Sequence, residues 1–234
     1  MKFQHAAAIW RDFPELVPGI LFAEGITARL PTAARTAEFT EAARSRLAGV
    51  TESELPEIAA WRRTFSRMGL KPTQYRCAAE SLLRRFRKDG ALPGLHPLVD
   101  LCNAASIAFA IPVAVFDAGQ IAGDLQVCYA TGDEEYLTFS GQAEHPAPGE
   151  VIFADGAGRA HARRWSNRQS GRSAVRDQTP AALIVAEALH ASAPADVPAL
   201  ISALAGELTA AGCRVSAVTV LTQSTPACTI GPSP

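Results

Sequence analysis

The sequence contains no apolar run that approaches the roughly 20 residues needed to cross a bilayer. Its first residues, Met1 to His5, lack the long apolar stretch of a signal peptide. The five cysteines are an odd number, and no two of them have CxxC spacing, which argues against a disulfide framework or a zinc site. We therefore expect reduced thiols, no metal, no membrane contact and a cytoplasmic location.

Motifs for nucleotide loops and for common hydrolytic centres are also missing. The chain contains neither GxGxxG nor a GxxxxGKS/T sequence. Its five histidines show no HxH or HExxH spacing, and none stands next to a cysteine. We expect no cofactor, and a nucleophilic role for Cys102 is disfavoured because a reactive thiolate needs a base or cation beside it.

Charge is distributed unevenly along a chain whose total is nearly neutral. With 48% apolar and 19% charged residues, the 234 residues are sufficient for a folded core. Residues 62–88 carry nine basic side chains and one acid, and residues 157–176 carry six basic side chains and no acid. The two segments either form one face that binds a polyanion or are balanced by acids from elsewhere in the fold.

The pattern of elements is typical of an α+β protein. Helices are predicted over 32–47, 52–68, 72–88, 97–110 and 198–211, and strands over 17–26, 113–116, 125–130, 136–140, 151–154, 160–165, 181–188 and 214–221. Helices precede most of the strands, which favours α+β over α/β. We expect one domain over residues 1–222 and a disordered tail over 223–234, where Pro226, Pro232 and Pro234 fall. The oligomeric state is left open.

Two groups of polar residues lie on predicted helices. Arg76, Glu80 and Arg84 have i, i+4, i+8 spacing, which fits either surface ion pairs or a wall where Glu80 orients two guanidinium groups. Spacing alone favours the ion pairs. Asp100 and Asn103 share a face of the helix that begins near His96, and this polar stripe fits a hydrogen-bond network or a pocket wall.

The densest basic cluster runs from Arg163 to Ser170 and contains Trp165. An indole beside arginines is the combination that holds unpaired nucleotides by stacking and charge. The alternative is that Trp165 closes the core while the arginines face water. We favour the nucleic-acid interpretation because no acid in this stretch balances the charge.

At these residues the chain resembles a known domain family. Residues 98–103 (LVDLCN) and 111–117 (IPVAVFD) resemble the VVDxTN and QPxHAFD motifs of the B3/B4 tRNA-editing domain in the phenylalanyl-tRNA synthetase beta subunit. Residues 151–155 are similar to its strand before the catalytic hairpin, and Ser173 to Val175 with Thr179 is similar to its SxV…T segment.

Free-standing proteins of this family are more similar still. They share ExLxRR at residues 80–85, PLVDxxN at 97–103 and RRWxxRQ at 163–169. The resemblance covers roughly residues 70 to 190. It implies a compact α+β domain with a β-sandwich-like core flanked by helices. It also implies contact with the acceptor end of tRNA and hydrolysis of a wrongly esterified amino acid.

The synthetase domain removes tyrosine from the phenylalanine tRNA, and its site residues are matched only in part. Asn103 matches the asparagine of the synthetase site, and Cys102 stands where the synthetase has threonine. The synthetase histidine falls on Ala114, and its tyrosine-recognising glutamate falls on Val185 by spacing. Three hypotheses follow: a free-standing aminoacyl-tRNA deacylase, a non-catalytic tRNA-binding module, and an amino-acid-binding protein.

An aminoacyl ester is already activated, so a positioned water and an oxyanion donor suffice for its hydrolysis. Asn103 and Gln169 are predicted to hold the water or the ester carbonyl, and Glu80 or Asp100 to meet the α-ammonium. The predicted tRNA-binding residues are Arg76, Arg84, Arg85, Asp117, Arg164, Trp165, Asn167 and Arg168. We expect these residues to line one concave site and the two basic segments to share one face.

Overall fold

The structure is a computed structural model that describes residues 1–231. Its helices are α1 (Ala7–Asp12), α2 (Ala33–Arg46), α3 (Pro56–Arg67), α4 (Ala78–Asp89), α5 (Pro97–Phe109) and α6 (Ala193–Ala210). Its strands are β1 (Lys2–His5), β2 (Val17–Glu24), β3 (Val113–Asp117), β4 (Leu125–Tyr129), β5 (Glu135–Leu137), β6 (Ala143–Glu144), β7 (Val151–Asp155), β8 (Arg159–Arg163), β9 (Arg168–Gln169), β10 (Ala181–Ala188), β11 (Arg214–Val220) and β12 (Ala227–Thr229). No helix in this part of the chain is long and apolar enough to cross a membrane.

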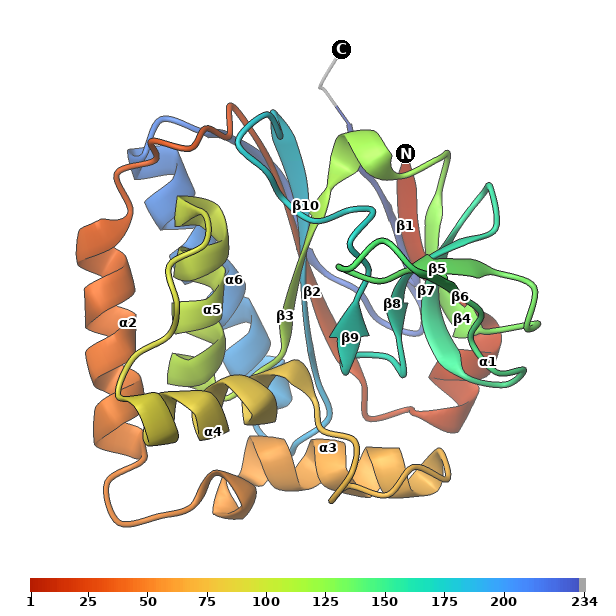
Figure 1. The fold of residues 1–234 in the computed structure, drawn as a ribbon, viewed down its shortest axis with the longest axis horizontal. Coiled ribbons are helices and arrows are strands. Elements are labelled where there is room, and N and C mark those ends of the chain that lie inside the picture. Colours follow the sequence, from red (N-terminus) through yellow and green to blue (C-terminus); the bar gives the residue numbers. More distant parts are fainter. Residues whose placement is uncertain (232–234) are drawn as a thin grey trace.

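The strands form two sheets that face each other. One sheet is antiparallel with the order β11-β2-β10-β3, and the other is mixed with the order β12-β1-β4-β7-β8-β5-β6, with β9 paired to β8. Helices α5 and α6 cover the outer face of the four-stranded sheet, α2 packs against α5, and the mixed sheet covers the inner face (Figure 1). The predicted α+β class and the paired-sheet core with flanking helices are confirmed.

Alternation along the central strands explains these layers. On β2, Ile20 and Phe22 pack into the core between the sheets, while Leu21 and Ala23 pack beneath the helices. Successive side chains of a strand point to opposite faces, so a strand covered on both faces is apolar throughout. Helix α6 packs so closely over β2 that a Cβ on Gly19 would lie 2.6 Å from the Val197 and Ile201 side chains.

Several helix boundaries differ from the predicted ones, and proline explains the start of α3. Thr51 and Glu54 do form a capping box, but it caps only the short 3-10 turn Glu52–Glu54, and α3 begins at Pro56. Proline disfavours helical backbone at the residue before it, so Leu55 is extended and the predicted helix splits. Helix α4 begins at Ala78 and not at 72, with Cys77 as its N-cap.

The predicted disordered tail is wrong over residues 223–231. Strand β12 pairs antiparallel with β1, with Phe3 opposite Cys228, and Ile230 is buried. The alternating apolar side chains of Cys228 and Ile230 join the core in spite of the nearby prolines. The domain therefore extends past the predicted boundary at 222, and Pro232 and Pro234 lie outside the described residues.

Candidate functional site

An open cavity of about 450 Å³ lies where the start of α5 meets β3 and β9. Its walls consist of Leu95, His96, Val99, Asn103, Val113, Val115, Phe139, Gln169, Ala174, Val175, Arg176, Asp177 and Gln178. Apolar side chains form the larger share of this lining, with a few polar groups among them. That composition and size are typical of a small-molecule site.

Asn103 and Gln169 are the two predicted catalytic residues that the fold brings together. Both line the open cavity, although they are 66 positions apart in the sequence. Gln169 Nε2 donates to the main-chain oxygen of Val115 at 2.6 Å, so its Oε1 remains available. Asn103 is partly exposed, and no other residue in 1–231 hydrogen-bonds its amide. The two amides can therefore act on a bound ligand.

His96 is a wall residue that the sequence did not reveal as a site residue. Its Nδ1 accepts from the main-chain N–H of Leu98 at 3.2 Å, which leaves the proton on Nε2. Burial lowers the pKa of His96, with Asp177 and Asp100 opposing this only in part. The cavity wall thus contains a neutral imidazole that presents a donor. Its position before a proline at a helix N-terminus was the available signal.

The rim of the open cavity holds unusually exposed apolar side chains. Leu95 is 69% exposed and Phe139 is 73% exposed, which makes them the most exposed large hydrophobic residues in the described chain. Exposed apolar groups that gather at one cavity mark a binding surface. Neither residue stood out in the sequence, because a single phenylalanine or leucine in a loop carries no pattern.

Trp165 does not form the predicted stacking surface. It is fully buried, and its ring meets Phe13 at 4.9 Å and Trp61 at 5.2 Å between centroids. Arg164 and Trp165 both have left-handed backbone, with φ of 46° and 57°, and this turn directs the indole into the core. The core interpretation of Trp165 was correct.

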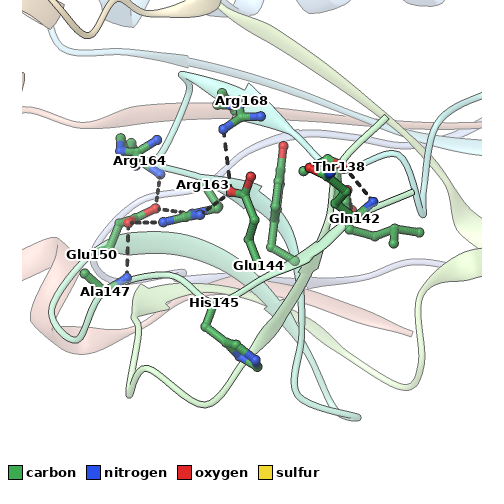
Figure 2. Close-up of polar contacts among 12 residues, drawn as sticks. Thr138, Gln142, Glu144, His145, Ala147, Glu150, Arg163, Arg164 and Arg168 are labelled. Atoms are coloured by element: carbon green, nitrogen blue, oxygen red, sulfur yellow. Dashed lines mark hydrogen bonds and ion pairs between the residues drawn. The ribbon is translucent and has the colours of Figure 1, made fainter. Parts of the chain in front are cut away.

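The arginine cluster around Trp165 is balanced by Glu150 and Glu144, which lie 13 and 19 residues before Arg163 in the sequence. Arg163 is buried between Glu150 at 2.9 Å and Glu144 at 2.7 Å (Figure 2). Arg168 is half exposed and lies 3.6 Å from Glu144. Burial acts to raise the pKa of Glu150, but Arg163 and Arg164 hold it below its usual value.

The first basic segment is balanced in the same way. Glu80 is completely buried, and its Oε1 lies 2.7 Å from Arg62 and 3.4 Å from Arg76. Burial raises the pKa of Glu80 although these arginines oppose the shift. Arg76 precedes α4, so the three residues do not form a ladder along one helix, but the ion pair between Arg76 and Glu80 that the spacing favoured is present. Glu80 and Arg76 do not line the open cavity.

The remaining arginines of α4 bind acids at the other end of that helix. Arg84 and Arg87 both lie 2.9 Å from Glu52, and Arg85 lies 3.6 Å from Asp89. Arg76 itself does approach the second segment, because Asn167 Nδ2 donates to its main-chain oxygen at 2.7 Å. The basic segments also meet where Ala78 N donates to the main-chain oxygen of Ser166 at 2.7 Å and where the Arg164 guanidinium lies 4.7 Å from the Tyr75 ring centroid. The open cavity contains only one arginine of the two segments, Arg176.

Asp100 and Asp117 hold the backbone and do not line the open cavity. Asp100 Oδ1 accepts from the N–H of Leu95 at 2.9 Å. Asp117 accepts from Gly119 N and from Thr179 Oγ1, at 2.9 and 2.7 Å. Both carboxylates shape the loops beside the cavity, so neither is placed to meet a ligand there.

Neither the Cys102 thiol nor the group of residues with metal-ligand geometry lines the open cavity. Cys102 is buried among apolar side chains, and burial raises the pKa of its thiol. One group in the described chain, Glu57, His190 and Asp196, has ligand-type atoms within 4.8 Å of one another. These residues are already bonded within the protein, since Arg46 lies 2.7 Å from Glu57 and Ser192 donates to Asp196 at 2.6 Å.

Residues 60–196 match the model of the B3/4 domain family, and the chain therefore belongs to that family. The resemblance predicted from the sequence motifs is confirmed. A curated relative, the phenylalanine--tRNA ligase beta subunit of Cereibacter sphaeroides, is 36% identical over 76 residues, which cover 32% of this chain and 9% of that subunit. The match therefore spans only a small part of the relative's length.

A solved structure of an N-terminal fragment of the phenylalanyl-tRNA synthetase beta subunit from Pyrococcus horikoshii aligns with a TM-score of 0.48 and 10% identity. The alignment covers 91% of this chain and 49% of that fragment.

Proposed function

We propose that the protein binds the aminoacylated acceptor end of a tRNA and hydrolyses the ester in the open cavity. The observation that carries this proposal is the pair Asn103 and Gln169, two amides in the wall of one cavity of about 450 Å³. Membership of the B3/4 domain family supports the choice of an aminoacyl-tRNA over other esters.

Each amide has a distinct part in the proposed hydrolysis. The Nε2 group of Gln169 donates to the main-chain oxygen of Val115, so its Oε1 is left to accept a hydrogen bond from the attacking water and to hold that water in place. The Asn103 amide donates to the ester carbonyl oxygen as negative charge develops on it. Water attacks the carbonyl carbon, the bond to the ribose oxygen breaks, and that oxygen leaves with a proton from water.

The cavity also offers partners for the ends of this substrate. Asp177 is an exposed carboxylate in the wall and meets the α-ammonium in place of Glu80 or Asp100. The exposed ring of Phe139 provides a surface on which the terminal adenine stacks. Arg176 is exposed at the same rim, and with Arg168 it binds the phosphates.

One observation favours a second candidate, a tRNA-binding module without catalysis. The walls contain no serine, threonine or cysteine, and Asp177 is their one carboxylate among the described residues. A cavity without a nucleophilic side chain can bind the aminoacyl ester without cleaving it.

The experiment that decides is deacylation of a panel of aminoacyl-tRNAs by the purified protein, with tRNA affinity measured in parallel. Turnover of one or a few esters supports the proposal, and binding without turnover selects the non-catalytic module. Asn103→Ala tests the site, and Gln223→Ala, an exposed amide outside the matched region, is the control. Equal loss in both variants would overturn the assignment of the cavity.

A further inference from the structure

A second, inner cavity of about 60 Å³ adjoins the open one, because Val113 and Gln169 belong to the walls of both. The inner cavity lies between the two sheets. Ala114 on β3 and Val185 on β10 form one side, and Phe153 on β7 and Ala162 on β8 form the other. Gln169 therefore separates the open cavity from a small apolar compartment.

A carboxylate stands in the wall of this apolar compartment. Glu187 follows Val185 by two positions on β10, so its side chain points to the same face, toward the other sheet. It is only 3% exposed, and its Oε1 lies 2.7 Å from Nε2 of His5, which is buried as well. The inner cavity thus has one strong acceptor group.

Two further polar groups on the walls have no partner within the protein. Trp165 Nε1 and Ser166 Oγ are buried, and neither is hydrogen-bonded to another residue in 1–231. Buried polar groups are nearly always paired, and an unpaired one costs free energy. The compartment therefore combines an acceptor with unused donors inside walls that are mostly apolar and that also include Asn167, Arg168 and Gln169.

We propose that the inner cavity receives the side chain of the esterified amino acid and selects a short side chain that ends in a hydroxyl. This inference rests on the proposed function and names its substrate class. A hydroxyl donates to the Glu187 carboxylate and accepts from the Trp165 indole at once. An ammonium group has only donors, so it would leave the indole without an acceptor.

Volume sets the upper limit on the side chain. A cavity of about 150 Å³ holds benzene, so a compartment of about 60 Å³ accepts only a few non-hydrogen atoms. Serine and threonine side chains have this size, whereas an aromatic ring does not fit. The resemblance implied tyrosine for the synthetase domain, and this compartment indicates a smaller hydroxylated residue.

Valine is the informative competitor, because it has the shape of threonine without the hydroxyl. A site that binds a hydroxyl through buried polar groups discriminates strongly against such an isostere, by about 10⁴ where the pairing is complete. The inner cavity remains open to the outer one, so we expect a smaller ratio, about 10² in favour of threonine.

The test measures binding without relying on turnover. Adenosine analogues that carry seryl, threonyl, alanyl, valyl, phenylalanyl or tyrosyl groups through a stable 3′-amide are titrated into the full chain by calorimetry. The seryl and threonyl analogues should bind about 10² more tightly than the valyl analogue. Equal affinity for the threonyl and valyl analogues, or tightest binding of the phenylalanyl or tyrosyl ones, would overturn the inference.

Two variants test whether the inner cavity causes the preference for the threonyl over the valyl analogue. Glu187→Gln retains a partner for His5 but removes the charge, and it should lower the threonyl-to-valyl ratio about tenfold. Ala114→Leu fills the compartment, so it should abolish binding of the threonyl analogue and spare the alanyl one. Glu57→Gln, a buried carboxylate outside both cavities, is the control and should leave the ratio unchanged.

The experiments distinguish failure of the proposed hydrolysis from failure of the inner-cavity inference. Hydrolysis of aminoacyl-tRNA without preference for the hydroxylated analogues rejects the inner-cavity inference and keeps the proposed function. A clear preference among the analogues without hydrolysis of any aminoacyl-tRNA keeps the inference about the compartment and rejects catalysis.

Discussion

Gln169 donates from Nε2 to the main-chain oxygen of Val115 at 2.6 Å, and this bond links β9 of the mixed sheet to β3 of the four-stranded sheet. Tyr136 Oη donates to the main-chain oxygen of Gln169 at 2.8 Å and is a second bond that holds this residue in place. The Gln169 side chain is thereby held in the wall that separates the open cavity from the inner one.

Replacing Gln169 by alanine should affect stability and turnover together. Loss of the bond to Val115 should lower the free energy of unfolding by about 1 kcal/mol, the usual net value of one hydrogen bond. Turnover of the hydrolysed ester should fall about 10²-fold or more, since the water loses its acceptor. Urea titration and single-turnover deacylation measure the two effects. Unchanged turnover in a folded Gln169→Ala protein would remove Gln169 from the mechanism.

Asn103→Ala should separate catalysis from binding. Because Asn103 lines the cavity without another partner in the described chain, its loss leaves the fold intact. We expect deacylation to fall about 10²-fold or more, and the dissociation constant for tRNA to change little. Filter binding and single-turnover kinetics provide the comparison. A parallel loss of affinity would mean that Asn103 holds tRNA rather than the reacting ester.

Arginine substitutions should have the opposite effect. Arg168→Ala and Arg176→Ala should each weaken tRNA binding more than turnover at saturation, because their guanidinium groups meet phosphates. With Arg164, these give about three contacts, and a logarithmic plot of affinity against salt should have a slope of about −2. Arg29→Ala, an exposed arginine away from the cavity, is the control. A flat salt response would exclude a nucleic-acid partner.

Cys102→Ser should retain turnover. The thiol is buried in an apolar cluster and its pKa is raised by that burial, so it is neither a thiolate nor open to a substrate. The serine hydroxyl finds an apolar surrounding, which should lower the free energy of unfolding by about 1–3 kcal/mol. Melting curves and deacylation rates test both statements. A folded variant without turnover would reinstate a cysteine nucleophile.

The Arg163–Glu150 pair predicts how stability depends on pH. Despite burial, the pKa of Glu150 in the folded state lies below its usual value, and that value, about 4.3, applies to the unfolded chain. The pair therefore stabilises the fold above this pH, and its contribution disappears as the pH falls through the folded pKa. The melting temperature should fall between about pH 5 and pH 3.

Glu150→Gln should be less stable at pH 7 and should show a smaller loss on acidification. Glu41→Gln, which removes an exposed carboxylate, should keep the wild-type profile. Calorimetric melting from pH 3 to 7 supplies the measurement. The expectation fails if the two variants behave alike.

The sequence predicted the layered α+β core because its signals there are local. A short apolar run such as that within Val17–Glu24, flanked by turn residues, favours a buried strand, and His96, Pro97 and the polar stripe with Asn103 define the start of α5. The short strands β1 and β12 escaped prediction, since three or four residues form a strand only when a partner is present. The motifs around Asn103 and Gln169 also identified the family correctly.

By itself, the sequence determined the class of fold, the domain family and the two amides that the open cavity brings together. Which acidic side chains pair with the basic ones was decided only by the tertiary structure. Residues 62–88 and 157–176 look like a polyanion-binding surface, yet Glu52, Glu144 and Glu150 arrive from other segments and neutralise much of it. Ion pairs form between groups that are close in space, and spacing in sequence does not report that distance. The inner cavity with Glu187 and His5 likewise exists only because two sheets pack face to face.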